Sequence, residues 1–226
     1  VMTRSYIAPE RNPGDQKDAA ALTVLAELLG GSMQTSVLGR ELAMKGKALW
    51  VNAGYDGFSV DPTSFGISLV PADGMAPEEA EAELDKVLAR FLETGPDAAD
   101  LDRVKTQIEA ARVYALDSAH GRAYDYGQGL ATGLSVEDVA AWPDILAAVT
   151  AEDVMAAARK VLGNEASVTG WLLPPPPTEG EAPAPTPAAA EAQPTPAPVP
   201  APIPAPIPAD DAAPAPAEAP SPEVQG

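Results

Sequence analysis

The sequence predicts an α+β fold, with an antiparallel or mixed sheet and helices packed on one face of it. Over residues 1–173 a few short segments alternate apolar and polar residues with period two, and the longer segments between them repeat their apolar residues with helical spacing. The strands are too few and too clustered for a doubly wound parallel sheet. Proline separates this body from the rest, because 19 of the 26 prolines follow residue 173.

The first elements are a strand and two helices. Residues 3–8 form the expected strand. A helix then begins at Asp15 and ends at Gly30 and Gly31, because glycine accepts the left-handed conformation found at many helix ends. A second helix is expected over residues 33–45.

A pair of strands follows the second helix. Apolar residues alternate from Leu49 to Tyr55 and again from Phe65 to Leu69, with a turn at Asp61 and Pro62 between them. Two adjacent strands with one apolar face each predict a hairpin whose second face is open.

The remaining body is predicted to be mainly helical. A helix begins at Pro77, which suits a first helical turn, and another begins after Asp97. Ser135 and Thr150, each followed three residues later by Asp, resemble capping boxes and predict two further helix starts. The helix after Asp97 is expected to bury a stripe of five residues, namely Leu101, Val104, Ile108, Ala111 and Ala115. Residues 167–173 are expected to form a closing strand.

Residues 174–226 are predicted to be a disordered, acidic, Pro/Ala-rich tail. The segment holds seven acidic residues, no basic residue and no aromatic residue. Such a composition buries too little apolar surface to offset chain entropy and favours polyproline II. The tail is expected to be a solvated spacer, and a ligand for an aromatic groove is the alternative.

Composition excludes several classes of function. The formal net charge is −19, which disfavours nucleic acid as a partner. The chain has no cysteine and a single histidine, His120, so a thiolate site and a two-histidine zinc site are both excluded. No apolar run is long enough for a membrane span. No metal site is expected in this chain, and His120 is expected to be an ordinary hydrogen-bonded or exposed residue rather than a lone ligand.

Several motifs in order resemble the pitrilysin/insulinase family of metallopeptidases. Residues 20–31 match the family's helix ending in Leu-Gly-Gly, and residues 36–50 match a second helix running into a Gly-Leu-Ala-Tyr-type strand. Later segments agree as well, at residues 65–70, 117–118, 131–133, 142–143 and 149–154. The resemblance covers nearly all of residues 1–173 and none of the tail, and it implies the family's α+β domain.

The resemblance also implies that zinc binding and catalysis belong to a different domain from this one. Family members bind zinc through H-x-x-E-H on a helix, and the motif Glu activates water. The domain that bears this motif is paired with a similar domain that lacks it, and the two enclose a peptide chamber. Because this sequence has no H-x-x-E-H, it resembles the second, non-zinc domain. Zinc and the H-x-x-E-H motif are then expected in another domain or subunit, extended peptide is the expected substrate, and no catalytic residue is expected here.

In many relatives the second domain contributes an Arg and a Tyr, seven positions apart, that hold the substrate backbone. Those positions fall on Ala43 and Trp50, so the usual pair is absent or displaced. Arg40, one helical turn earlier, and Tyr55, further along the strand, are the nearest substitutes. The substrate-binding candidates are therefore Arg40, Trp50 and Tyr55, with a packing role as the alternative for Trp50. Tyr124 and Tyr126 are expected to pack in the core or at its rim, and lining a peptide groove is the alternative.

Two functions of the body remain open from the sequence, and in a third interpretation the Pro-Ala tail is the functional part and tethers the body to an envelope structure. In the first, this is the non-zinc domain of an insulinase-like metallopeptidase, inactive alone, that completes the peptide chamber. In the second, it is a non-catalytic structural or binding subunit of the same fold, which the missing Arg/Tyr pair favours. Relatives with Ala-rich sequences like this are often bacterial and exported, and the Lys-free Pro-Ala tail fits an envelope spacer. Both observations favour a periplasmic or cell-envelope location, and the absence of cysteine is compatible with it.

Overall fold

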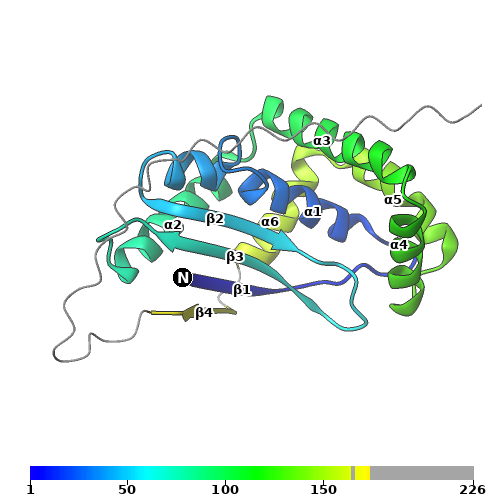
Figure 1. Ribbon diagram of the computed structural model, residues 1–226, viewed down its shortest axis with the longest axis horizontal. Helices are drawn as coiled ribbons and strands as arrows, with labels where there is room; N and C mark the ends of the chain where they lie inside the picture. Colours follow the sequence, from blue (N-terminus) through cyan, green and yellow to red (C-terminus); the bar gives the residue numbers. More distant parts are fainter. Residues whose placement is uncertain (164–165, 174–226) are drawn as a thin grey trace, which may run out of the picture. The chain divides into compact units, whose positions relative to one another are not determined.

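A four-stranded antiparallel sheet with helices packed on one face forms the body, as the sequence predicted (Figure 1). The computed structural model describes residues 1–163 and 166–173, and within them the strand order is β2-β3-β1-β4. The strands are β1 (Met2–Ala8), β2 (Ala48–Tyr55), β3 (Thr63–Pro71) and β4 (Ser167–Trp171). The helices are α1 (Lys17–Gly30), the short π-helical turn η1 (Gly39–Ala43), α2 (Pro77–Thr94), α3 (Ala98–Leu116), α4 (Ala119–Ala131), α5 (Val136–Ala148) and α6 (Ala151–Leu162). The predicted tail, residues 174–226, lies outside the described residues.

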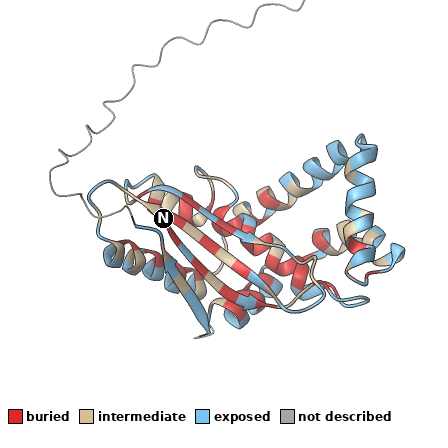
Figure 2. Cartoon of the chain, turned by 60° about the horizontal axis from the view of Figure 1, so that its bottom comes forward, coloured by how far each residue is buried: buried red, intermediate tan, exposed pale blue. Residues whose placement is uncertain are grey.

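The sheet buries one face and leaves the other open. In β1 the residues Met2, Arg4, Tyr6 and Ala8 are buried, and the residues between them are not. Antiparallel pairing places these residues beside the buried Leu69, Ile67 and Phe65 of β3. The buried residues of β1 and β3 therefore lie on the same face of the sheet, which is the face that the helices cover. Buried residues follow this pattern in Figure 2.

Glycine at the end of α1 has a different role from the one expected. Gly31 has φ −64° and ψ −26°, so the helix does not end in a left-handed residue. A Cβ on Gly30 would instead lie 1.9 Å from the backbone nitrogen of Ala53 in β2. Glycine is needed at position 30 because the helix backbone packs directly on the strand.

Arg4 is a charged residue on the covered face of the sheet, and its charge is neutralised there. Its Nε donates to Thr169 Oγ1 at 3.0 Å, and its guanidinium forms ion pairs with Glu81 and Asp85 of α2. Burial alone would lower the pKa of Arg4, but the hydrogen bonds to Asp85 and Glu81 outweigh it and raise the pKa. These contacts tie α2 to β1 and β4.

The predicted helix over residues 33–45 is shorter than expected, because its helical residues span only 37–43. Only a short helical start and the π-helical turn η1 form there. Leu38 and Leu42 are nevertheless buried, so the predicted apolar face packs on the core as expected.

The two capping boxes form as predicted and start α5 and α6. Ser135 Oγ accepts from the backbone N–H of Asp138, and Thr150 Oγ1 accepts from that of Asp153. Each aspartate carboxylate in turn accepts a 2.9 Å hydrogen bond from the backbone N–H of its capping residue. The caps satisfy amide groups that the first helical turn leaves unpaired.

The apolar stripe of α3 is buried only over its first half. Leu101 and Val104 are buried and Ile108 is partly buried, but Ala111 and Ala115 are exposed. The helix runs past the end of the sheet and its covering helices, toward α4 and α5 (Figure 1). Figure 2 shows the helices at that end as largely exposed. The stripe has the predicted helical spacing, but within residues 1–163 and 166–173 no element covers its last two positions.

Candidate functional site

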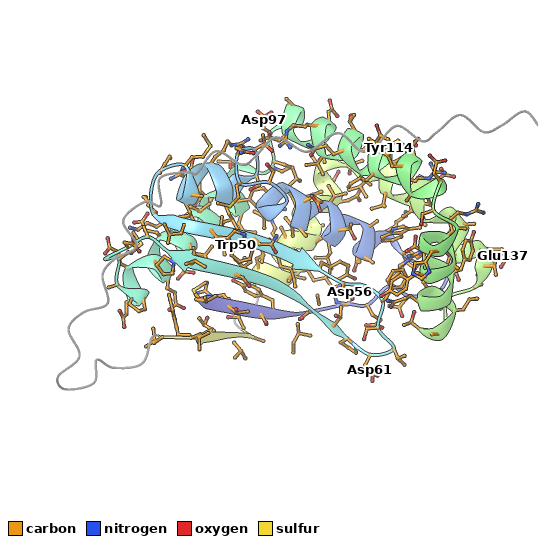
Figure 3. All side chains as sticks on the ribbon, in the orientation of Figure 1. Trp50, Asp56, Asp61, Asp97, Tyr114 and Glu137 are labelled. Carbon is orange, nitrogen blue, oxygen red and sulfur yellow. The ribbon has the colours of Figure 1, made fainter. Side chains whose placement is uncertain are left out.

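The open face of the sheet places Trp50 where a substrate could reach it. Trp50 lies on β2 with Asn52 and Gly54, opposite Val70, Ser68 and Gly66 of β3. It is 43% exposed although it is a large apolar residue. Figure 3 shows its position on the sheet. Large exposed aromatic side chains are favoured contacts in binding sites, because they supply area at low entropic cost.

Arg40 is held by acceptors of its own domain. In η1 its guanidinium donates 3.1 and 2.5 Å hydrogen bonds to the two carboxylate oxygens of Asp100, and a 2.7 Å bond to the carbonyl of Thr35. The hydrogen bond to Asp100 raises the pKa of Arg40 and lowers that of Asp100. The pair fixes η1 to the start of α3, and the prediction that Arg40 binds substrate stays a prediction.

Tyr55 lies on the covered side of the sheet. Its hydroxyl donates a 2.6 Å hydrogen bond to the carbonyl of Pro9, and its ring packs against the core. Burial raises the pKa of the Tyr55 hydroxyl. Because Tyr55 and Trp50 are five residues apart on one strand, they point to opposite faces. The structure therefore separates Trp50 from Tyr55, and the substrate-binding role of Tyr55 likewise stays a prediction.

The two positions of the expected Arg/Tyr pair differ in environment. Ala43, the last residue of η1, is partly buried and packs against the core. Trp50 is exposed on the open face. An alanine methyl group cannot donate to a peptide carbonyl, so only the indole N–H of Trp50 could act at these two positions.

Metal ligands do not gather in the described part of the chain. Over residues 1–163 and 166–173, no group of three His, Asp or Glu side chains is placed to hold a metal ion. His120 is exposed in the first turn of α4. Within the same residues, no helix has the length and hydropathy needed to cross a membrane.

The structure also contains a cavity that the sequence did not predict. A cavity of about 500 Å³ lies among α3, α4, α5 and the segment after β2. Arg11 and Phe58 line it, as do Trp142 of α5 and Tyr126 of α4. Tyr126 thus lines a cavity rather than the core, while Tyr124 is 59% exposed. No local signal marks Arg11, because only Gln16 among its partners is near in sequence, and Phe58, Asp138 and Trp142 come from distant segments.

The comparisons with known proteins agree with this fold. Residues 5–108 match the sequence profile of the peptidase M16 inactive domain; M16 is the pitrilysin/insulinase family. No curated protein is significantly similar to the sequence. Three solved structures illustrate the shared fold.

The inactive peptidase domain of a zinc protease candidate from Bordetella parapertussis is 17% identical, with a TM-score of 0.69, over 81% of this chain and 94% of that one. A protease from Helicobacter pylori is 20% identical, with a TM-score of 0.68, over 74% of this chain and 40% of that protein. The periplasmic protease PqqL from Escherichia coli is 19% identical, with a TM-score of 0.57, over 77% of this chain and 19% of that protein. This chain therefore spans less than half of the last two proteins.

The sequence profile and the fold both indicate the inactive type of M16 domain. The matched profile describes the inactive domain, and the Bordetella structure is such a domain by itself. Over residues 5–108 the chain is therefore similar to the inactive, non-zinc type of M16 peptidase domain, and its body has the fold of such a domain.

Proposed function

We propose that this domain is the non-zinc part of an M16 metallopeptidase and that it lines the peptide chamber. The zinc-dependent hydrolysis of peptide bonds would come from another domain or chain that carries H-x-x-E-H. The match of residues 5–108 to the inactive-domain profile carries this proposal. The single histidine of the sequence supports it, because one histidine cannot supply the family's zinc ligands.

The open face of β2 and β3 is the surface we assign to the peptide. Trp50 and Val70 offer apolar contact, and Asn52 and Ser68 offer hydrogen-bonding groups beside them. Gly54 and Gly66 face each other further along and carry no side chain, so a peptide backbone can approach the sheet there. An extended peptide needs such a strip of alternating apolar and polar contacts.

The first experiment measures peptide cleavage by the 226-residue chain with a quenched fluorescent peptide, with and without added zinc. No cleavage is expected in either case. The chain is then used to capture its partner from extracts of its source cells. A captured subunit with H-x-x-E-H is expected, together with a peptidase activity that phenanthroline removes and zinc restores. Cleavage by the chain alone would contradict the proposal.

A matched pair of variants tests the surface. In the assembled peptidase, Trp50→Ala should lower kcat/KM for an extended peptide by about tenfold, as expected when a binding aromatic is truncated. Val168→Ala is the control, because Val168 is 75% exposed on the same open face but lies on β4. Both variants should assemble normally. If Trp50→Ala and Val168→Ala had equal kcat/KM values, the assignment of Trp50 to the peptide-binding surface would be wrong.

The rival function is a structural or binding subunit of the same fold. The observation that favours it is the replacement of the usual Arg and Tyr by Ala43 and Trp50. It predicts a captured partner that lacks H-x-x-E-H and a complex without peptidase activity. We also propose a periplasmic or envelope location, for which the periplasmic relative PqqL is the support. Fractionation of the source cells tests it.

A further inference from the structure

The cavity beside Arg11 has the dimensions of a small-molecule site. Its volume of about 500 Å³ lies within the range of roughly 300–1,000 Å³ typical of ligand pockets. Most of its wall is apolar and comes from three helices, with Ile108, Ala111, Ala115, Val139, Trp142 and Leu146 as the main contributors.

Arg11 is buried at this cavity without a carboxylate partner. Its side chain is 4% exposed, and it forms no ion pair with any residue the structure describes. Nε donates to Gln16 Oε1, and Nη2 donates to the carbonyl of Asp138 at 3.1 Å. Nη1 of Arg11 has no hydrogen-bond acceptor among the described residues. The Asp138 carboxylate acts on Arg11 through space and forms no ion pair with it. An anionic group in direct contact with Nη1 would supply the hydrogen-bond acceptor that this buried guanidinium lacks.

Aromatic rings hold the Arg11 guanidinium in place. It lies 3.9 Å from the ring centroid of Trp142 and 5.3 Å from that of Phe58. These contacts stabilise the cation and fix its plane, but they leave donors at its edge unused. Burial lowers the pKa of Arg11 to about 10, which still leaves it charged at neutral pH.

Four more charged residues line the cavity. Arg112 forms a 3.2 Å ion pair with Glu109, and both are exposed. Arg122 is exposed, and its guanidinium has no hydrogen-bond or ion-pair partner among the described residues. Asp125 acts on Arg11 only through space, beyond ion-pair distance. Three arginines and two acids line the cavity, and the Asp138 carboxylate is a third negative charge that acts on Arg11 through space.

The cavity wall also includes a helix face that stays exposed among the residues the structure describes. Ala111 and Ala115 continue the apolar stripe of α3, yet they are exposed and line the cavity. An apolar ligand body would cover this stripe while its charged end met the arginines.

We propose that this cavity binds a small carboxylic acid with an aromatic or aliphatic body, its carboxylate held by Arg11 and Arg122. The body would lie against Trp142, Leu146 and the exposed alanines of α3. This site is separate from the open sheet face assigned to peptide, and its test needs no zinc-bearing partner.

The experiment titrates the 226-residue chain with 3-phenylpropanoate by isothermal titration calorimetry, and with the uncharged 3-phenylpropanamide as the matched probe. The carboxylate should bind about tenfold more tightly than the amide, because charge-assisted hydrogen bonds are roughly twice as strong as neutral ones. Arg122→Gln should weaken carboxylate binding by about fivefold to tenfold. Arg159→Gln, an exposed arginine on α6 away from the cavity, should change nothing.

A second variant fills the cavity without touching the arginines. Ala115→Trp changes an exposed helix position, so folding should persist, and it should abolish binding of the acid. Binding of acid and amide with equal affinity would overturn the proposal, and so would unchanged binding by Ala115→Trp. Tighter binding of N-acetyl-Ala-Phe than of 3-phenylpropanoate would reassign the site to a peptide C-terminus and overturn the small-molecule proposal. No binding at millimolar probe would overturn it as well.

Discussion

Gly30 of α1 and Ala53 of β2 approach so closely that no side chain fits between them. A Cβ on Gly30 would lie 1.9 Å from the nitrogen and 2.8 Å from the Cα of Ala53. Both atoms are backbone, so they cannot move aside as the tip of a flexible side chain could. This contact sets the distance between α1 and the sheet, and α1 is the helix that buries most of its length.

Gly30→Ala should therefore lower the free energy of unfolding by about 2–3 kcal/mol, since overpacking forces backbone shifts. Urea unfolding followed by circular dichroism measures this loss. Gly66→Ala is the control, because a Cβ on Gly66 meets nothing within 4 Å on the open face of β3. Losses of equal size in the two variants would show that steric contact with Ala53 is not the cause.

Arg40→Gln should cost about 1 kcal/mol or less at pH 7, because the Arg40–Asp100 pair is partly exposed. Arg40 lowers the pKa of Asp100 in the folded protein, so the pair's contribution is complete above the unfolded carboxyl pKa of about 3.9. The contribution disappears as the pH falls below that value through the lower folded pKa. Urea unfolding of wild type and variant at pH 7 and pH 2.5 should show a difference that shrinks in acid.

Lys160→Gln is the comparison for Arg40→Gln, because the Lys160–Asp18 pair is well over half exposed on both sides. It should have a smaller effect at pH 7. A difference between wild type and Arg40→Gln that stays constant between pH 7 and pH 2.5 would contradict the assigned ion pair.

Thr150→Ala should destabilise the protein by about 1 kcal/mol, the usual cost of losing an N-cap. The cap starts α6, whose residues Val154, Ala158 and Val161 are in the core. Thr150→Ser keeps the hydroxyl that accepts from Asp153, and thermal unfolding should place it close to wild type. If serine and alanine were equally damaging, the lost contact would be the threonine methyl group and not the cap.

Tyr55→Phe removes the 2.6 Å hydrogen bond to Pro9 and should cost about 1 kcal/mol at neutral pH. Burial raises the pKa of Tyr55 above its unfolded value of about 10, so folding favours the neutral hydroxyl. Wild-type stability should therefore fall as the pH rises above 10, and the variant should lose less over that range. Unfolding curves at pH 8 and pH 11 measure this; parallel losses in both proteins would contradict it.

The local elements were predictable because their causes lie within a few residues. The capping boxes at Ser135 and Thr150 satisfy amides of the adjacent turn, and the alternation in β2 and β3 expresses the period of an extended chain. Pro77 and Asp97 likewise start helices through their own backbone and side chain. The helix predicted over residues 33–45 forms only over residues 37–43, yet Leu38 and Leu42 still reach the core from this shorter segment.

The candidate site was predictable only in part. Trp50 lies on the open face because strand alternation places it there, and that alternation is visible in the sequence. The partners of Arg40 and Tyr55 come from α3 and from the segment after β1, which no local pattern connects to them.

By itself, the sequence determined the α+β class, the order of its elements, the absence of a two-histidine zinc site and the resemblance to a non-zinc peptidase domain. Only the tertiary structure decided that Gly30 is needed for close packing on Ala53, that Ala111 and Ala115 stay uncovered, and that Arg11 meets Trp142 beside a cavity. Sequence patterns report forces that act over one turn of helix or one pleat of strand. Packing between distant segments depends on the path of the whole chain, and that path determines which side chains meet.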